Sequence, residues 1–340
     1  MKYFIYLLLV GLVVLFCTTE AWIPKPELSG EIVMVSELRD SPILHKIATI
    51  KSTDKIIEAW IYESQLNYPI GSHVIFQKEA DQYSVTDVLR TNSLAKLFLV
   101  FLFVVIAISG MHGIRSVIGL LFSFLVIFNY VLPNIIAGGD PIFIALGASS
   151  LILFISYFLT HGLNTKSIIA VFGTMGALLI TGIIANIFGK YSGVTGFGSE
   201  EAGFLIGQLA IGNFYNLLIA GIIIGSLGVL DDITISQTSI VEELAKANWK
   251  LDMWELFTRA MKIGHDHIAS LVNTLVLVYA GSSLPLLLLF VTSRATPLDL
   301  LNYEAVAEEI LRTLSGSIGL ITAVPITTFI AAFWYSDRRR

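Results

Sequence analysis

From residue 93 onward the chain alternates between long apolar segments and short polar ones. A helix needs about 20 predominantly apolar residues to cross the hydrocarbon core of a bilayer. Segments of about this length predict membrane-spanning helices at 94–110, 116–133, 141–160, 167–188, 213–230, 268–291 and 315–335. The pattern therefore predicts an all-α, multi-pass membrane bundle over residues 93–340.

The N-terminal residues carry a further apolar run. Residues 1–21 begin with a positive charge at Lys2, continue as a short apolar core and end in a possible small-residue cleavage site. This pattern is typical of a signal peptide or, if it is not cleaved, of a signal anchor. Counted as an anchor, it brings the predicted bundle to about eight helices. Residues 203–212 are also apolar but too few to cross, so we expect either a re-entrant piece or an extension of the next helix.

Residues 22–92 follow a different pattern. Five short runs alternate apolar and polar residues, as half-buried strands do, and turn residues separate them. The runs are GEIVMVSE, HKIATIKS, KIIEAWIYES, SHVIFQK and QYSVTDVLR. Five such runs predict a small closed β-barrel, with an OB-like fold as one option. This fold carries no function by itself, but the domain is a possible surface for a protein partner.

Composition and charge agree with a membrane protein. The chain is 55% hydrophobic and 14% charged, whereas a soluble domain is about 25% charged. A net charge of −5 leaves no basic patch for nucleic acid. Lysine and arginine follow the positive-inside rule if both termini and residues 231–267 are cytoplasmic. The β-rich domain is then extracytoplasmic.

The first candidate site follows the span 213–230. Its polar residues are Asp231, Asp232, Thr234, Ser236 and Gln237. On a continuing helix Asp232 and Ser236 share one stripe, and Asp231 and Thr234 form the stripe beside it. Acids at membrane depth are functional candidates by default, but the same residue types cap helices that begin at a membrane surface. Both interpretations stay open.

A second polar stripe lies in KIGHDHIASLVNTLVLVY, residues 262–279. Asp266, Ser270 and Asn273 have the spacing of one helix face, and Thr274 adjoins them. The simpler role for Asn273 and Thr274 is hydrogen bonding between helices. If both stripes face one water-filled path, they predict a binding site for a small molecule or an ion.

His265 and His267 flank Asp266 and raise the question of a metal. Zinc needs three or four convergent ligands, so these histidines form a site only if they meet Asp231 or Asp232. Soluble-enzyme motifs such as a P-loop or a nucleophile elbow are absent from the sequence. The sequence therefore favours a protein that is not an enzyme, and it identifies no particular cofactor, which stays unknown.

Other positions bear on movement and on the last span. Gly225, Gly228 and Pro285 are typical of close packing or of a kink, and in a transporter they would permit conformational change. The acids of 304–319, followed by Arg312 at helical spacing, predict a solvated helix that leads into the last span.

Three ordered stretches carry a family resemblance. They are GSLGVLDDITISQTSIVEEL, RAMKIGHDHIASLVNTLVLVYAGSSLPLLLLF and EEILRTLSGSIGLITAVPITT. From about residue 96 to the C-terminus the chain resembles the YibE/F-like family of bacterial multi-pass membrane proteins. The resemblance implies an integral plasma-membrane protein and no particular activity. The family's distinctive positions correspond to Asp231, Asp232, Gln237, His265, Asp266, His267, Asn273, Thr274 and Pro285.

Three functions remain compatible with the sequence. The first, which we favour, is a transporter or permease for an unknown small molecule or ion, with the bilayer as its environment. The second is a metal-dependent membrane enzyme that uses the aspartates and histidines. The third is a membrane-anchored structural protein that acts through its outer β domain.

Overall fold

The fold is described by a computed structural model for residues 28–37, 46–52, 55–61, 68–79, 82–206, 213–292 and 296–337. The chain forms two compact units, residues 1–114 and 115–340, and each is described by itself. The predicted signal segment 1–21 lies outside the described residues. So does most of the piece 203–212, of which only the first residues belong to a short helix, α6 (Glu200–Ile206).

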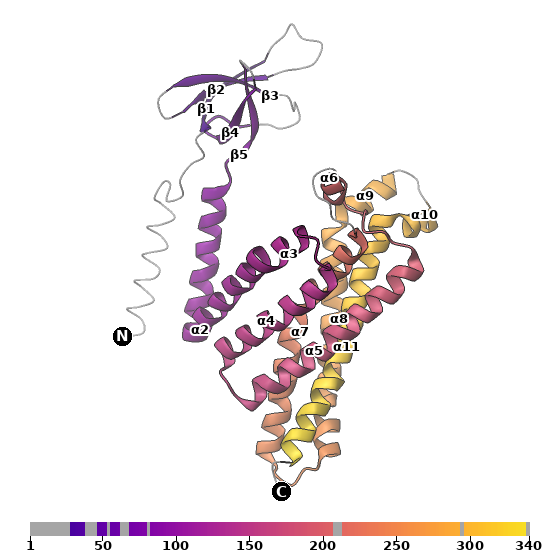
Figure 1. The fold of residues 1–340 in the computed structure, drawn as a ribbon. Coiled ribbons are helices and arrows are strands. Elements are labelled where there is room, and N and C mark those ends of the chain that lie inside the picture. Colours follow the sequence, from indigo (N-terminus) through magenta and orange to yellow (C-terminus); the bar gives the residue numbers. More distant parts are fainter. Residues whose placement is uncertain are drawn as a thin grey trace, which may run out of the picture. The chain divides into compact units, whose positions relative to one another are not determined.

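The first unit contains a closed five-stranded β-barrel (Figure 1). Its strands are β1 (Ser29–Glu37), β2 (Lys46–Lys51), β3 (Ile56–Ile61), β4 (His73–Glu79) and β5 (Gln82–Val88). They follow one another around the barrel as β1-β2-β3-β5-β4, with only the β3–β5 pair parallel among these contacts. Each apolar–polar run of the sequence supplies one strand, so the predicted barrel is confirmed.

Alternation along the strands fills the barrel interior. Ile32, Ile50 and Phe76 are at most 1% exposed, because successive side chains of a strand point to opposite faces. Phe76 meets Tyr83 edge to face, with the ring centroids 5.7 Å apart. The strand order agrees with the OB-like option.

Helix α2 (Thr91–Val126) continues from the barrel into the second unit and is interrupted once. Gly110 has φ 56° and ψ −129°, a conformation outside the helical region that glycine adopts without a Cβ penalty. The predicted spans 94–110 and 116–133 lie on either side of this break. A π-helical turn (Ile127–Val131) and α3 (Leu132–Ile136) complete the segment.

The second unit is a bundle of long helices (Figure 1). It consists mainly of α4 (Pro141–His161), α5 (Thr165–Ser192), α7 (Phe214–Ala247), α8 (Met253–Ser282) and α11 (Glu304–Asp337). Helices α4, α7 and α11 run in one direction, and α5 and α8 run in the other, as the contacts between them require. We call the end where α7 stops and α8 starts the basic end, because it carries Lys166, Lys246, Lys250, Arg259 and Lys262.

Small residues allow the bundle helices to approach closely. A Cβ on Gly173 of α5 would collide with Thr327 of α11, and a Cβ on Gly319 of α11 would collide with Thr181 of α5. Membrane helices associate through such small-residue contacts, since burial from lipid provides little hydrophobic driving force. Around them the interior is apolar, with Leu178, Ile219, Ile223, Leu230 and Leu320 at most 1% exposed.

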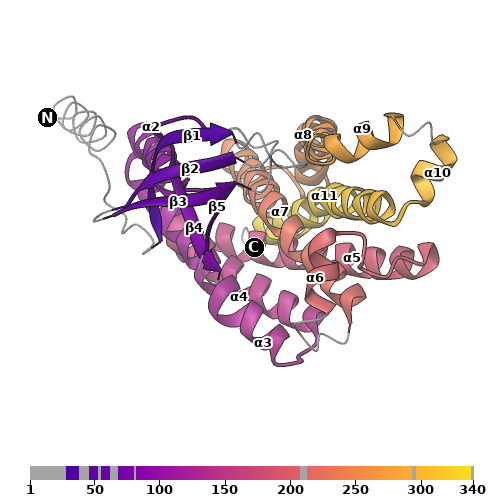
Figure 2. The same cartoon turned by 90° about the horizontal axis from the view of Figure 1, so that it is seen from above.

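Five helical segments in the described part of the chain are long and apolar enough to cross a membrane. They contain six of the seven predicted spans, because 94–110 and 116–133 fall in one segment. The exception is 268–291, where α8 ends at Ser282 and α9 (Leu284–Thr292) begins. Pro285 lacks the N–H that would continue α8 and its ring would clash with the carbonyl of Gly281. Helix α10 (Pro297–Asn302) follows α9 beside α11 (Figure 2).

Candidate functional site

Helix α7 does not end at the two aspartates. It begins after Asn213, whose side chain accepts a hydrogen bond from the Asn216 N–H at 3.0 Å, and it continues to Ala247. Asp231 and Asp232 lie in its middle, so the interpretation of these residues as an N-cap is wrong. At 1.5 Å per residue a helix of 34 residues spans about 51 Å, longer than the hydrocarbon core of about 30 Å.

The residues around Asp231 join a hydrogen-bonded network between three helices. The hydroxyl of Tyr157 (α4) lies 3.2 Å from Thr174 Oγ1 (α5) and 2.7 Å from Thr234 Oγ1 (α7). It also donates to the backbone carbonyl of Asp231 at 2.9 Å. The two threonine hydroxyls are 2.7 Å apart. All three hydroxyl side chains are buried, so the interior of the bundle is polar at this level.

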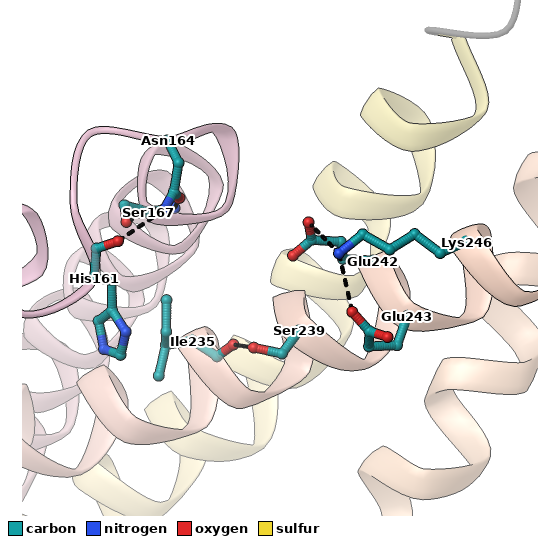
Figure 3. A network of polar contacts seen from close by, with 8 residues as sticks. All are labelled: His161, Asn164, Ser167, Ile235, Ser239, Glu242, Glu243 and Lys246. Atoms are coloured by element: carbon teal, nitrogen blue, oxygen red, sulfur yellow. Dashed lines mark hydrogen bonds and ion pairs between the residues drawn. The ribbon is translucent and has the colours of Figure 1, made fainter. Parts of the chain in front are cut away.

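The two aspartates have different surroundings. Asp231 is half-buried, and its carboxylate interacts with Tyr157. Asp232 is exposed and interacts electrostatically with His161 at the end of α4. Figure 3 shows the His161 imidazole beside Ile235 of α7, one turn beyond the aspartates. Within the described residues no salt bridge reaches Asp231. Among the described residues the Asp231 carboxylate therefore has the Tyr157 hydroxyl and the neighbouring acid Asp232 as its polar partners, and no cation.

The polar character of α7 continues toward the basic end. Ser239 Oγ donates to the Ile235 carbonyl at 2.7 Å. Lys246 Nζ lies 2.9 Å from Glu242 and 3.0 Å from Glu243 (Figure 3). Exposed pairs of this kind contribute little to stability, about 0–1 kcal/mol. We take them as the solvated end of the helix and not as part of the site.

Gln237 faces α8 and not the Tyr157 network. Its side chain is fully buried and Nε2 donates to the Ala260 carbonyl at 3.1 Å, while Oε1 has no partner in the described structure. A Cβ on Gly264 would lie 3.2 Å from Gln237 Nε2 and 2.6 Å from Val324 Cγ1. Gln237 therefore fixes a close contact among α7, α8 and α11 that leaves no room for a ligand.

The second predicted stripe lies elsewhere. Asp266, Ser270, Asn273 and Thr274 are exposed on α8. The opposite face of α8 uses its apolar residues, such as Leu275, to pack on the bundle, and this turns the polar stripe outward. Asp232 and Ser236 are also exposed, on α7. The expectation that both stripes line one path is not met, because the α7–α8 contact is made by other faces.

The candidate metal ligands do not assemble in the described part of the chain. No three His, Cys, Asp or Glu side chains there come together in a way that could hold a metal ion. His265 is exposed, and His267 is partly buried with Nδ1 lacking a hydrogen-bond partner. These histidines thus provide no support for the metal-dependent enzyme hypothesis.

The residues predicted to permit movement lie at two kinds of position. Gly225 and Gly228 are exposed on the same face of α7 as Asp232, and a Cβ at either glycine would meet no described atom within 4 Å. Neither glycine packs closely inside the described bundle. Pro285 lies next to the break between α8 and α9.

A second polar cluster was missed by the sequence interpretation. The expected solvated helix at 304–319 is wrong for Glu308, which is 6% exposed and accepts a hydrogen bond from the Gly198 N–H at 2.9 Å. Glu304 accepts bonds from the Thr195 N–H and hydroxyl, at 2.7 and 2.5 Å. The glycine-rich loop before α6 is held by these carboxylates. Spacing alone could not reveal a loop that closes over the start of a distant helix.

Four long apolar helical segments lie wholly in the second unit and a fifth begins before it, which together with the buried polar layer gives this unit the character of a membrane helix bundle. The profile of the YibE/F-like protein family matches residues 97–337, so the chain belongs to the YibE/F-like family. The resemblance carried by the three sequence stretches is thereby confirmed. Neither a curated protein nor a solved structure matches the chain.

Proposed function

We propose that the protein is a transporter or permease of the bacterial cell membrane, with its binding site at Asp231 inside the bundle. In this proposal the basic end is cytoplasmic, which agrees with the positive-inside rule. The barrel is then extracytoplasmic, because the chain crosses the membrane between it and the basic end. The single observation that carries the proposal is the buried hydroxyl network beside an acid for which the described part of the chain provides no salt bridge.

The chemistry of the network suits a cation or a protonated amine. A carboxylate buried among helices is costly unless a positive group or a proton compensates it. The network that adjoins it through Tyr157 contains oxygen atoms only: three hydroxyl groups and the backbone carbonyl of Asp231. Oxygen ligands are those that hard cations prefer. The hydroxyl network bonds only the backbone carbonyl of Asp231, so its structural role would not need an acidic side chain at this position.

The surroundings of the site allow α7 to move. Glycine lowers the cost of local helix distortion, and Gly225 and Gly228 lie within two turns of Asp231 on a face with free space. The exposed Asp232 lies at the level of the network, and the exposed His161 is the last residue of α4, on the side of the basic end. They provide a polar route from the cytoplasm to Asp231. This route includes none of the exposed polar residues of α8, which are Asp266, Ser270, Asn273 and Thr274.

A ligand screen tests the proposal. Thermal unfolding of the purified full-length protein is measured with Na⁺, K⁺, divalent cations, protonated amines and amino acids, for wild type and for Asp231→Asn. A ligand at a hundredfold excess over its Kd stabilises the folded state by about 2.7 kcal/mol. Asp266→Asn is the matched control, because this exposed acid lies outside the network.

We expect one ligand class to stabilise wild type and Asp266→Asn but not Asp231→Asn. Equal stabilisation of all three proteins by every ligand would place the site elsewhere. If no ligand stabilises wild type, the barrel domain becomes the remaining candidate for function.

A further inference from the structure

The far end of the bundle contains a pocket that lies away from Asp231. Its volume is about 330 Å³, and residues of α8, α9, α10 and α11 line it. Most lining residues are aliphatic, such as Val276, Leu287 and Leu301. The volume falls at the lower end of the range for small-molecule sites, about 300–1,000 Å³. The pocket exists because Pro285 ends α8 and sends α9 and α10 to one side (Figure 2).

A second pocket of about 370 Å³ lies on the neighbouring face of α11. It is lined by residues of α5, α10 and α11. The two pockets share Leu301, Ile310 and Leu314, which form a ridge between them. Leu301 and Leu314 are 56% and 54% exposed. Both pockets therefore open onto the apolar outer surface of the bundle.

The first pocket has a polar rim on one side. Glu309 lines it and is held by Arg312, with the Arg312 Nε atom 3.4 Å from Glu309 Oε2. Tyr279 also lines the pocket and interacts electrostatically with both charged residues. The Glu309 side chain keeps 26% of its surface exposed. A carboxylate with this exposure remains available to a positive group that enters from the pocket.

We propose that this pocket holds an acyl chain of a bilayer lipid whose headgroup carries an amine, with Glu309 as the partner of that amine. One acyl chain of the lipid lies against Leu287 and Val276. The ridge that contains Ile310 and Leu314 separates it from the second acyl chain, which occupies the neighbouring pocket. The site is distinct from the one proposed for transport.

Three observations select a lipid over other occupants. Most residues that line the pocket are aliphatic, both pockets border α11, a helix long and apolar enough to cross a membrane, and the two pockets lie on either side of one ridge. A diacyl lipid matches this pair, whereas a single small solute needs only one pocket. The rim carries both Glu309 and its partner Arg312, so an amine headgroup can place its amine at Glu309 and its phosphate near Arg312, whereas an anionic headgroup offers Glu309 no positive group.

Quenching by brominated lipids tests the proposal. Tryptophan is introduced at Leu287, which lines the pocket, or at Leu288, which is 63% exposed on the same helix and does not line it. Full-length variants are reconstituted in vesicles that contain brominated phosphatidylethanolamine, phosphatidylcholine or phosphatidylglycerol. The signal of each introduced tryptophan is the difference from wild type, which has five native tryptophans.

We expect Leu287→Trp to be quenched by phosphatidylethanolamine at a mole fraction about two- to fivefold lower than by phosphatidylglycerol, the range of a partly exposed ion pair. Leu288→Trp should respond equally to all three lipids. Glu309→Gln in the Leu287→Trp background should abolish the preference. A Leu287→Trp signal that no lipid quenches, or a preference that survives Glu309→Gln, would overturn the proposal.

A second measurement leaves the pocket unaltered. Wild type and Glu309→Gln are extracted in mild detergent from membranes that contain phosphatidylethanolamine and phosphatidylglycerol. The lipid that stays bound to each protein is identified and quantified by mass spectrometry. Wild type should retain phosphatidylethanolamine over phosphatidylglycerol, and Glu309→Gln should not. Equal retention by both proteins contradicts the role of Glu309. Neither result depends on Asp231, so this proposal and the transport proposal fail independently.

Discussion

Replacing Thr234 with valine removes the centre of the interhelical network while preserving side-chain shape. Thr234 Oγ1 has three polar neighbours: Tyr157 OH and Thr174 Oγ1, each at 2.7 Å, and the Asp231 carbonyl at 3.1 Å. The first two contacts join α7 to α4 and α5. The change therefore tests whether these hydroxyls hold the three helices together at the proposed site.

The expected loss of stability follows from the contacts. Hydrogen bonds between membrane helices contribute about 0.6 kcal/mol each, so two interhelical contacts give about 1.2 kcal/mol. Thr328→Val is the matched control, because the Thr328 hydroxyl is equally buried but donates only to the Val324 carbonyl of its own helix. Such a bond within a helix contributes almost nothing to stability. The control should therefore lose less than about 0.3 kcal/mol.

Reversible unfolding of the full-length protein in mixed micelles, titrated with a denaturing detergent, measures both variants. A double-mutant cycle with Tyr157→Phe should give a coupling free energy of at least about 0.5 kcal/mol, as for residues in direct contact. Equal stability loss in Thr234→Val and Thr328→Val, with no coupling to Tyr157→Phe, would refute the reasoning. The hydroxyls would then be paired without holding the helices together.

Three further predictions concern packing, the barrel and the loop. Gly319→Ala should destabilise the bundle by about 1–3 kcal/mol in the same unfolding assay, because the added Cβ collides with the Thr181 side chain of α5. Gly228→Ala is the control and should not destabilise the bundle, because its added Cβ meets no described atom within 4 Å. Phe76→Ala should destabilise the barrel by about 3–5 kcal/mol, seen as faster hydrogen exchange of its strands with the bundle unchanged. Glu308→Ala should speed exchange of the Gly198 amide, while Glu308→Gln, which keeps an acceptor, should do so less; unchanged exchange in both would contradict the proposed anchoring.

Local patterns were sufficient to predict the barrel and most helices. Strand alternation depends only on neighbouring residues, and the structure buries Ile32, Ile50 and Phe76 inside the barrel as this alternation requires. The same is true of the long apolar runs. The break at Ser283 was not predicted, because residues 268–291 contain no charged side chain and Pro285 was interpreted as a kink within one span.

The site was predicted only in part, because it depends on contacts between distant segments. Asp231 and Thr234 were identified from their depth and polarity. Their partners Tyr157 and Thr174 were not, since a tyrosine or threonine in an apolar helix gives no signal until its neighbours are known. The stripe at Asp266 had equally good spacing, yet the packing of α8 turns it outward. Helical periodicity predicts which residues share one face of a helix, but it does not predict whether that face packs on another helix or is exposed.

Flux through reconstituted protein tests the central claim most directly. Full-length wild type, Asp231→Asn and Asp266→Asn are placed in proteoliposomes, and uptake of the stabilising ligand is followed under imposed proton and Na⁺ gradients. The account predicts uptake by wild type and Asp266→Asn, and none by Asp231→Asn above protein-free liposomes. Uptake by Asp231→Asn equal to that of wild type, or no uptake by wild type under any gradient, would contradict it.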